Sequence, residues 1–486
     1  MTSTAAPATR ASAPIVLLGV ILVSYLMIII DNSIVITGLP QIRQDLNLSV
    51  TGVSWVQNAY TLTFGGLLLL GARCGDLLGR RRVFLFGLGL FTAASVVVGS
   101  APTGGILIAA RAVQGIGSAI LAPATLALLT AGFPAGRERV RAVAAYGSVA
   151  GIGAALGLVL GGLVADLLSW RFGFFVNLPI GLVLFWATRR FVAPVPGRPG
   201  RFDVLGAVTS TAGMTALVFG IVRVADSGWG DPATLGPLGA GVALLGGFVF
   251  VESRAAEPIM PLRLFASRER TGGYVVRLLF IGAMISFFLF LSQYLQGVHG
   301  WTPLQAGAAF LPMSVINFVV AVLVPRMTVR WGGPRLLVAG VAVTFLGMAW
   351  LSRLSPEGGY LADVVGPLLL LGAGQGMAFA PLTAAGIAGV DSEDAGAAAG
   401  LVNAAHQLGG ALGLGVLTTV AAAFASGDDA RTHMSTGAAA ALTGSAVLLG
   451  LALVLAVVLI LPSYRRSVPG TGVNRLPGPA QTGSAR

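Results

Sequence analysis

Two charged residues, Asp31 and Arg111, stand within long apolar segments of the chain. An ionised side chain at membrane depth costs roughly 2.5–3.5 kcal/mol, so it usually faces a cavity or a partner. At about 1.5 Å per helical residue, both lie on the order of 10 Å from the same membrane face. A carboxyl group that separates from a guanidinium loses the charge that keeps it ionised, and it can then take up a proton. We predict that the two residues meet and couple to protons; the alternatives are a structural ion pair or an arginine that snorkels to the membrane surface.

Other polar residues in apolar segments are candidates for a second proton site or for a binding cavity. A histidine side chain ordinarily titrates at about pH 6.5, so His406 is the candidate second proton site. The candidate cavity residues, each of which can instead join two helices by a hydrogen bond, are Asn58, Tyr60, Gln114, Gln293, Asn317, Gln375, Asn403 and Gln407. An apolar pocket is expected from Tyr60, Phe287, Phe288 and Phe310.

The amino-acid composition indicates that the apolar segments are surrounded by lipid. The chain has 486 residues, of which 55% are hydrophobic and 10% charged, with a mean hydropathy of +0.87. Soluble proteins carry about 25% charged residues, so most of this surface must face lipid. The net charge of +12 comes from scattered arginines, since the chain has no lysine. This scatter favours lipid headgroups over nucleic acid as the partner. The single cysteine, Cys74, excludes an internal disulfide.

Fourteen apolar segments are long enough to cross a bilayer as helices, because about 20 residues suffice and lipid requires backbone groups to pair internally. They begin near Ile15, Thr51, Val83, Gly104, Val140, Phe172, Val204, Leu235, Gly272, Leu304, Leu336, Asp363, Ala397 and Gly437. The loops on one side carry 23 arginines and those on the other carry 5, and the remaining two, Arg111 and Arg277, fall within apolar segments. Positive charge marks the cytoplasmic side, so we expect a multi-pass protein of the bacterial inner membrane with both termini inside.

An internal repeat divides the chain into halves. Gly71–Phe84 aligns with Val324–Leu337 at an offset of 253 residues, and the aligned pairs are Arg73 with Arg326, Gly79 with Gly332 and Arg82 with Arg335. Paired halves are typical of alternating-access proteins. We predict residues 1–14 as a disordered leader, 15–192 as a six-helix bundle, 193–271 as a linker with two extra helices, 272–461 as a second six-helix bundle and 462–486 as a disordered tail.

Several motifs carry a resemblance to a known family. Gly75-Asp76-Leu77-Leu78-Gly79-Arg80-Arg81-Arg82 resembles the signature loop of the major facilitator superfamily, and Arg111-Ala112-Val113-Gln114-Gly115 resembles its second motif. Asp31-Asn32-Ser33-Ile34-Val35, with Leu39-Pro40, resembles the pattern of 14-helix drug:proton antiporters. Gly157-Leu158 with Gly161-Gly162 resembles the exporter motif, although that motif usually has Gly-Pro at its first two positions. The likeness extends over roughly residues 15–461.

The resemblance implies a fold and residue roles. It implies an all-α major facilitator fold of two six-helix bundles with two extra central helices. It also implies a conformational switch loop at Asp76, Gly79, Arg80 and Arg81, and an exporter-type glycine motif at Gly157, Gly161 and Gly162. The function implied is proton-coupled export of small lipophilic, sometimes cationic, drugs or antibiotics. A monomer is the family's usual state.

A nutrient importer and a membrane-embedded enzyme are the two alternative functions. A nutrient importer needs several polar cavity residues to replace water around its substrate, and here they are sparse. A membrane-embedded enzyme needs a convergent catalytic set, but the three histidines lie in separate segments and no metal or nucleotide spacing occurs. We therefore expect no cofactor, with a proton gradient as the energy source.

Overall fold

The computed structural model of the chain describes residues 14–48, 50–134, 136–194, 197, 203–255, 258–391 and 394–462. All regular structure among these residues is helical. The first-half helices are α1 (Pro14–Asp45), α2 (Val50–Leu78), α3 (Arg80–Ser100), α4 (Gly104–Gly132), α5 (Arg137–Leu167), α6 (Trp170–Phe175) and α7 (Asn177–Phe191). Two further helices follow, α8 (Val204–Ser227) and α9 (Pro232–Glu252). The second half, after the 3-10 turn η1 (Leu262–Ala266), contains α10 (Arg268–Gly297), α11 (Pro303–Ala308), α12 (Leu311–Trp331), α13 (Gly333–Leu351), η2 (Tyr360–Val364), α14 (Val365–Gly386), α15 (Ala395–Phe424), α16 (Ala430–Leu455) and η3 (Ala456–Ile460).

Thirteen helical segments of the described chain are long and apolar enough to cross a membrane. The remaining segment of the fourteen expected, the fifth, coincides with α5, a helix of 31 residues. Two expected spans are each built from two helices. The sixth is divided between α6 and α7, where Pro179 cannot donate a backbone hydrogen bond, and the tenth between α11 and α12, where Pro312 has the same effect.

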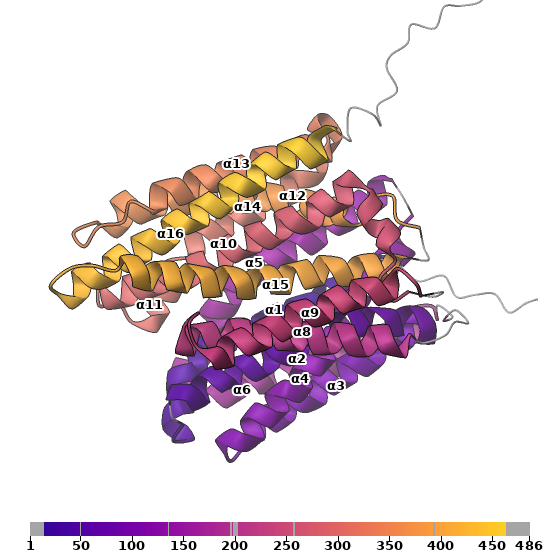
Figure 1. The fold of residues 1–486 in the computed structure, drawn as a ribbon, viewed down its shortest axis with the longest axis horizontal. Helices are drawn as coiled ribbons and strands as arrows, with labels where there is room; N and C mark the ends of the chain where they lie inside the picture. Colours follow the sequence, from indigo (N-terminus) through magenta and orange to yellow (C-terminus); the bar gives the residue numbers. More distant parts are fainter. Residues whose placement is uncertain are drawn as a thin grey trace, which may run out of the picture.

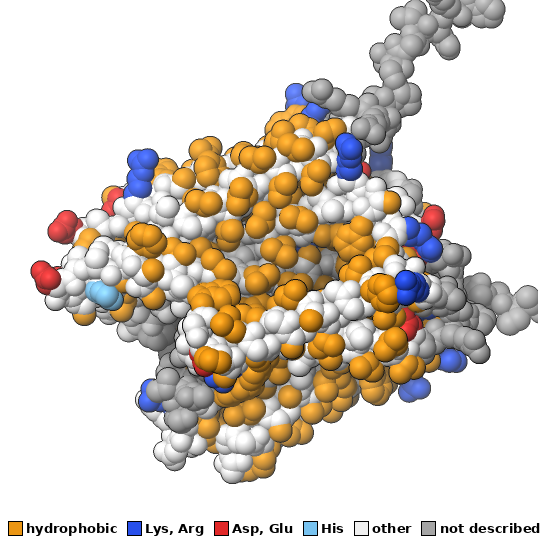
Figure 2. Space-filling view, in the orientation of Figure 1, with side chains coloured by type: hydrophobic (Ala, Val, Ile, Leu, Met, Phe, Trp, Pro, Cys, Tyr) orange, Lys and Arg blue, Asp and Glu red, His pale blue; other side chains and the backbone are white. Residues whose placement is uncertain are grey.

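The helices lie roughly side by side, and their lateral surface is apolar (Figures 1 and 2). Leu182, Val183 and Trp186 on α7 are each more than 60% exposed, as expected for side chains that face lipid. Charged side chains gather at the helix ends (Figure 2). We call the end at which α2 meets α3 and α4 meets α5 the basic end, since Arg80 and Arg137 begin helices there, and the opposite end the far end.

The helix pair α8–α9 lies beside both halves. The two helices pack on each other, and α8 also packs against α2 of the first half and α15 of the second. At the far end, Trp229 Nε1 donates a hydrogen bond of 2.6 Å to Thr419 Oγ1 on α15. This position agrees with a helix pair inserted between two bundles. The bundle boundaries stay a prediction, and residues 1–13 and 463–486 of the expected leader and tail lie outside the described residues.

The repeat inferred from sequence has a counterpart in the backbone. Gly79 joins α2 to α3 with φ 96°, and Gly332 joins α12 to α13 with φ 82°. Both residues occupy the left-handed region, which a side chain disfavours, so glycine is required at each turn. The two aligned segments therefore turn in the same way.

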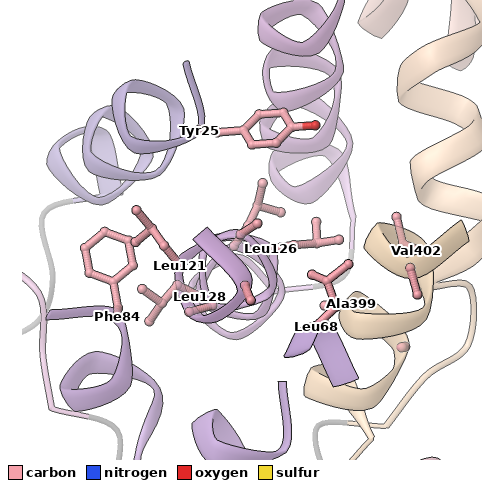
Figure 3. Close-up of a cluster of buried hydrophobic side chains, with 14 of the residues drawn as sticks. Tyr25, Leu68, Phe84, Leu121, Leu126, Leu128, Ala399 and Val402 are labelled. Carbon is pink, nitrogen blue, oxygen red and sulfur yellow. The ribbon is translucent and has the colours of Figure 1, made fainter. Parts of the chain in front are cut away.

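The two halves are packed together at the basic end. Leu68 of α2 lies beside Ala399 and Val402 of α15 within one buried cluster (Figure 3). A second cluster joins Ala144 of α5 to Val324 and Ala380 of the second half. The interface is therefore closed at this end.

Candidate functional site

Asp31 and Arg111 form a buried ion pair in the first half. Arg111 Nη1 donates to Asp31 Oδ2 at 2.8 Å, and neither side chain has any exposed surface. Asp31 comes from the middle of α1 and Arg111 from the far-end third of α4. The two residues whose depth was estimated from helical rise are thus brought together.

The second oxygen of Asp31 is held by two amides. Gln114 Nε2 and Asn177 Nδ2 each donate to Oδ1 at 2.8 Å. Both amides also donate to the hydroxyl of Ser95, at 2.7 and 3.2 Å. Four helices, α1, α3, α4 and α7, therefore hold one carboxyl group with donors on both oxygens, which is the environment that an ionised acid needs in a low-dielectric interior.

Arg111 has further partners besides Asp31. Its Nε donates to the carbonyl of Val56 at 3.2 Å, and Nη1 also donates to Gln114 Oε1 at 2.7 Å. The guanidinium lies 4.2 Å from the centre of the Tyr60 ring, a cation–π contact. Tyr60 in turn donates to Ser118 at 2.8 Å. Arg111 would therefore stay anchored if Asp31 lost its charge.

The expected switch loop lies at the basic end against the second half. Arg80 and Asp76 pair at 3.4 Å, and Arg80 also donates to the carbonyl of Ala127 at 3.4 Å. Arg81 donates to the carbonyl of Arg189 at 2.6 Å, which ties α3 to α7. A Cβ placed on Gly396 would overlap the Asp76 carboxylate, so this carboxylate lies against the first turn of α15. A helix N-terminus favours a negative charge at this position.

The glycine motif lies where α5 packs against α1. A Cβ on Gly157 would come within 2.5 Å of the Ser33 Cβ and 3.1 Å of the Ile30 Cα, so glycine lets the helices touch. Gly161 is buried on the same helix, and Gly162 lies near Leu304 of α11. Ser33 is two residues from Asp31, so this contact supports the helix that holds the carboxylate.

The remaining candidates are dispersed. Only Tyr60 and Gln114 belong to the Asp31 cluster. Asn317 donates to Gln375 at 2.9 Å within the second half, Asn403 donates to Ala399 on its own helix, and exposed Gln293 lines a surface pocket at the far end. Asn58 and Gln407 are half-buried.

The expected aromatic pocket is wrong in one member. Phe287, Phe288 and Phe310 do cluster, with ring centres 4.9 to 5.8 Å apart. Tyr60 instead lies against Arg111, because it belongs to the other half.

His406 lies apart from Asp31, beside a different arginine. Arg277 Nη2 and His406 Nδ1 are 3.5 Å apart, and Arg277 Nη1 donates to Thr383 Oγ1 at 2.9 Å. Arg277 is buried within α10. The sequence revealed Arg277 as an intramembrane charge without indicating a role. Ser95 and Asn177 gave no comparable signal, since hydroxyl and amide groups are common in membrane helices.

The chain matches the Major Facilitator Superfamily over residues 21–414. It is 40% identical over 451 residues to the cephamycin export protein CmcT of Amycolatopsis lactamdurans, covering 92% of each chain. It is also 40% identical over 411 residues to the puromycin resistance protein pur8 of Streptomyces alboniger, covering 83% of this chain and 81% of the other. Among solved structures, the proton:xylose symporter XylE is similar with a TM-score of 0.66 at 14% identity, covering 93% and 96% of the two chains. That likeness concerns the fold alone.

The chain therefore belongs to the Major Facilitator Superfamily, among its drug and antibiotic export proteins. It is a multi-pass membrane transporter of small molecules and not an enzyme. Within the described residues, no group of three His, Cys, Asp or Glu side chains is arranged to hold a metal ion.

Proposed function

We propose that this chain exports small, largely apolar drugs or antibiotics in exchange for protons, with Asp31 as the proton-carrying group. The observation that carries the proposal is a buried carboxylate whose positive partner has other anchors. Arg111 keeps the Val56 carbonyl, Gln114 and the Tyr60 ring when Asp31 is neutral. Protonation can therefore alternate with ion pairing without leaving a bare guanidinium in the membrane, which would cost several kcal/mol.

Protonation would also rearrange the amides around Asp31. A protonated carboxyl group carries one hydrogen-bond donor, whereas in this structure Oδ1 of Asp31 accepts hydrogen bonds from Gln114 and Asn177. These amides come from α4 and α7, and they share Ser95 of α3 as a second acceptor. A change in charge at one atom can thus alter how four helices of the first half are held together, which supports coupling between the proton and the shape of the cavity.

His406 is the weaker proton site. A proton on its ring would put a second positive charge about 3.5 Å from the Arg277 guanidinium, and like charges at that distance repel in a low-dielectric interior. Asp31 has no such conflict, because its neighbours are one cation and two amides.

The switch loop supports alternating access. Asp76, which pairs with Arg80 of its own half, lies against the N-terminus of α15 and so contacts the second half at the basic end. Opening that end must separate Asp76 from α15, and closing it restores a favourable charge–dipole contact. We place the basic end in the cytoplasm on the arginine asymmetry of the loops, with both termini on that side of the bacterial inner membrane, and we propose that the monomer is the transporting unit.

The test is a pH-quench assay with the full-length protein in liposomes under an imposed proton gradient. Lipophilic cations, acids and neutral antibiotics are added one at a time, and a pH-sensitive dye reports proton movement. Export by antiport predicts that proton release accompanies at least one compound and is lost in Asp31→Asn. The importer alternative predicts protons moving in the same direction as the compound. Absence of any proton movement, with folded protein and demonstrable substrate flux, would refute the coupling.

A further inference from the structure

Among the described residues, one buried positive charge in the membrane region has no carboxylate partner. Six charged side chains are buried within the described part of the chain, and Arg80, Glu252 and Asp394 of these lie at helix ends. Asp31 and Arg111 cancel each other. The sixth, Arg277, makes no ion pair with a carboxylate among the described residues, and its Nε has no hydrogen-bond partner.

Arg277 also lies at the interface between the halves. Its own contacts, Thr383 on α14 and His406 on α15, are neutral groups of the second half. The turn of α14 that carries Phe379 and Thr383 packs on α5 of the first half, since a Cβ on Gly147 would come within 2.8 Å of the Ala380 backbone nitrogen. Substrates of paired-half transporters bind between the halves, so this is a place where a ligand can touch both.

Aromatic rings lie at and near Arg277. The Phe379 ring lies 5.8 Å from the guanidinium, and it meets Phe280 edge to face. Where α5 packs on α14, Tyr146, the neighbour of Gly147, stacks on Tyr25 of α1 with ring centres 4.1 Å apart and an angle of 11° between the ring planes. A fixed cation among rings suits an anion attached to a flat apolar body, because the charge and the rings are satisfied by different parts of one molecule.

We propose that Arg277 binds the carboxylate of an acidic, aromatic or otherwise lipophilic substrate. This rests on the proposed export function and names its substrate class as organic acids, in place of the cations expected from the resemblance. A guanidinium presents several N–H donors in a planar fork that matches a carboxylate. With about nine residues between Arg277 and the start of α10 at Arg268, the charge lies on the order of 13 Å from the basic end. A substrate entering from that end meets Arg277 before it reaches Asp31.

The test compares two probes of the same shape, 2-naphthoate and its neutral amide. Equilibrium dialysis measures the affinity of the detergent-solubilised full-length protein for each, at neutral pH and without a proton gradient, with and without added chloride. The wild type should bind the acid roughly ten- to a hundred-fold more tightly than the amide. Arg277→Gln should abolish that preference and leave amide binding unchanged. Arg353→Gln, which removes an exposed arginine at the far end, should leave both affinities unchanged.

Each other result overturns the proposal. Equal affinities in the wild type, acid binding that survives Arg277→Gln, or equal weakening of both probes in that variant would show that Arg277 is structural. If Arg277→Gln does not fold, Arg277→Lys is measured in its place. Lysine keeps the positive charge but lacks the planar set of guanidinium donors, so this variant should keep part of the preference for the acid. If chloride alone stabilises the protein against heat and abolishes acid binding, the site holds an inorganic anion and not substrate.

Failure of this proposal is separable from failure of proton-coupled export. Binding at equilibrium needs no gradient, and Asp31→Asn should keep the preference for the acid. An Arg277-dependent preference without proton flux would refute the coupling alone, and proton-coupled flux without charge preference would refute the acid site alone.

Discussion

Asp31→Asn is the perturbation whose consequences follow most completely from the geometry. Asparagine has the shape of a protonated aspartic acid but cannot ionise, so the variant should be locked in the state that the wild type adopts at low pH. Of the bonds made by the carboxylate, the charge pair with Arg111 at 2.8 Å is lost. The contacts of Arg111 with Val56, Gln114 and Tyr60 remain.

The stability cost can be bounded. Removing one partner of a buried ion pair costs about 3–5 kcal/mol, since the other charge is left uncompensated. Because three anchors remain on Arg111, we expect a loss near the lower bound of about 3 kcal/mol. The variant should therefore fold and melt at a lower temperature than the wild type.

The effect on binding should depend on pH. If protonation weakens substrate binding without abolishing it, wild-type affinity falls as pH drops below the range where Asp31 is ionised, and it levels off at the affinity of the protonated form. The slope approaches tenfold, or about 1.4 kcal/mol, per pH unit. In Asp31→Asn, the affinity should be independent of pH and equal to the low-pH limit of the wild type. A fluorescent compound that gives a response in the liposome panel serves as the ligand in equilibrium titrations.

The matched control is Asp45→Asn. Asp45 accepts a hydrogen bond of 2.9 Å from Trp170 Nε1 near the far end, so this variant removes the same charge away from the Arg111 cluster. Its binding should keep the wild-type slope. A slope near tenfold per pH unit in Asp31→Asn would refute the assignment of the proton to this residue.

Three further predictions concern closure, packing and charge. Gly396→Ala should push Asp76 away from the N-terminus of α15 and open the basic end. Maleimide labelling of the single cysteine, half-buried Cys74, should then increase. Unchanged labelling would contradict closure through this contact. Gly157→Ala should destabilise the α1–α5 contact by about 1–3 kcal/mol. Gly89→Ala is the control and should not, because a Cβ at Gly89 would have no atom within 4 Å. Equal melting temperatures of the two variants would refute the packing role of Gly157. The hydrogen bond from Arg223 holds the pKa of Asp231 below its usual range. The interaction therefore stabilises the folded protein at pH values above the pKa of free aspartate, and this stabilisation is lost as pH falls through the lower pKa that Asp231 has in the folded protein. Asp231→Asn should therefore lower the melting temperature at neutral pH, and the difference should vanish in acid; a difference that persists there would show that it is not electrostatic.

The depth of a residue in the membrane could be predicted from the sequence, but its neighbours on other helices could not. Helical rise placed Asp31 and Arg111 at one level, and the structure pairs them. The same reasoning gave no rotation of a helix about its axis, so Asn177 and Ser95 were missed although both contact the cluster. Tyr60 was grouped with phenylalanines of the other half because both stand in apolar segments.

Loop chemistry was also beyond the sequence. The sequence has an acidic run at Asp391, Glu393 and Asp394, a pattern typical of a solvated loop, and Glu393 lies outside the described residues. Asp394 is instead buried and holds Arg263 through two hydrogen bonds of 2.8 and 2.9 Å. The start of α15 and the turn η1 meet only in the folded protein, so no spacing could indicate this pair. Asp363 accepts a hydrogen bond from the backbone N–H of Gly359 at 2.8 Å and belongs to the far-end turn, a role that its place in an apolar segment does not indicate.

The central claim, that a proton gradient drives export through Asp31, is tested most directly by the steady-state accumulation of a transported compound in proteoliposomes under a set pH difference and no membrane potential. Coupling to one proton predicts a concentration ratio across the membrane of up to tenfold per pH unit, about 1.4 kcal/mol, and a ratio of one in Asp31→Asn. A wild-type ratio of one in the presence of real flux, or an unchanged ratio in the variant, would contradict the account.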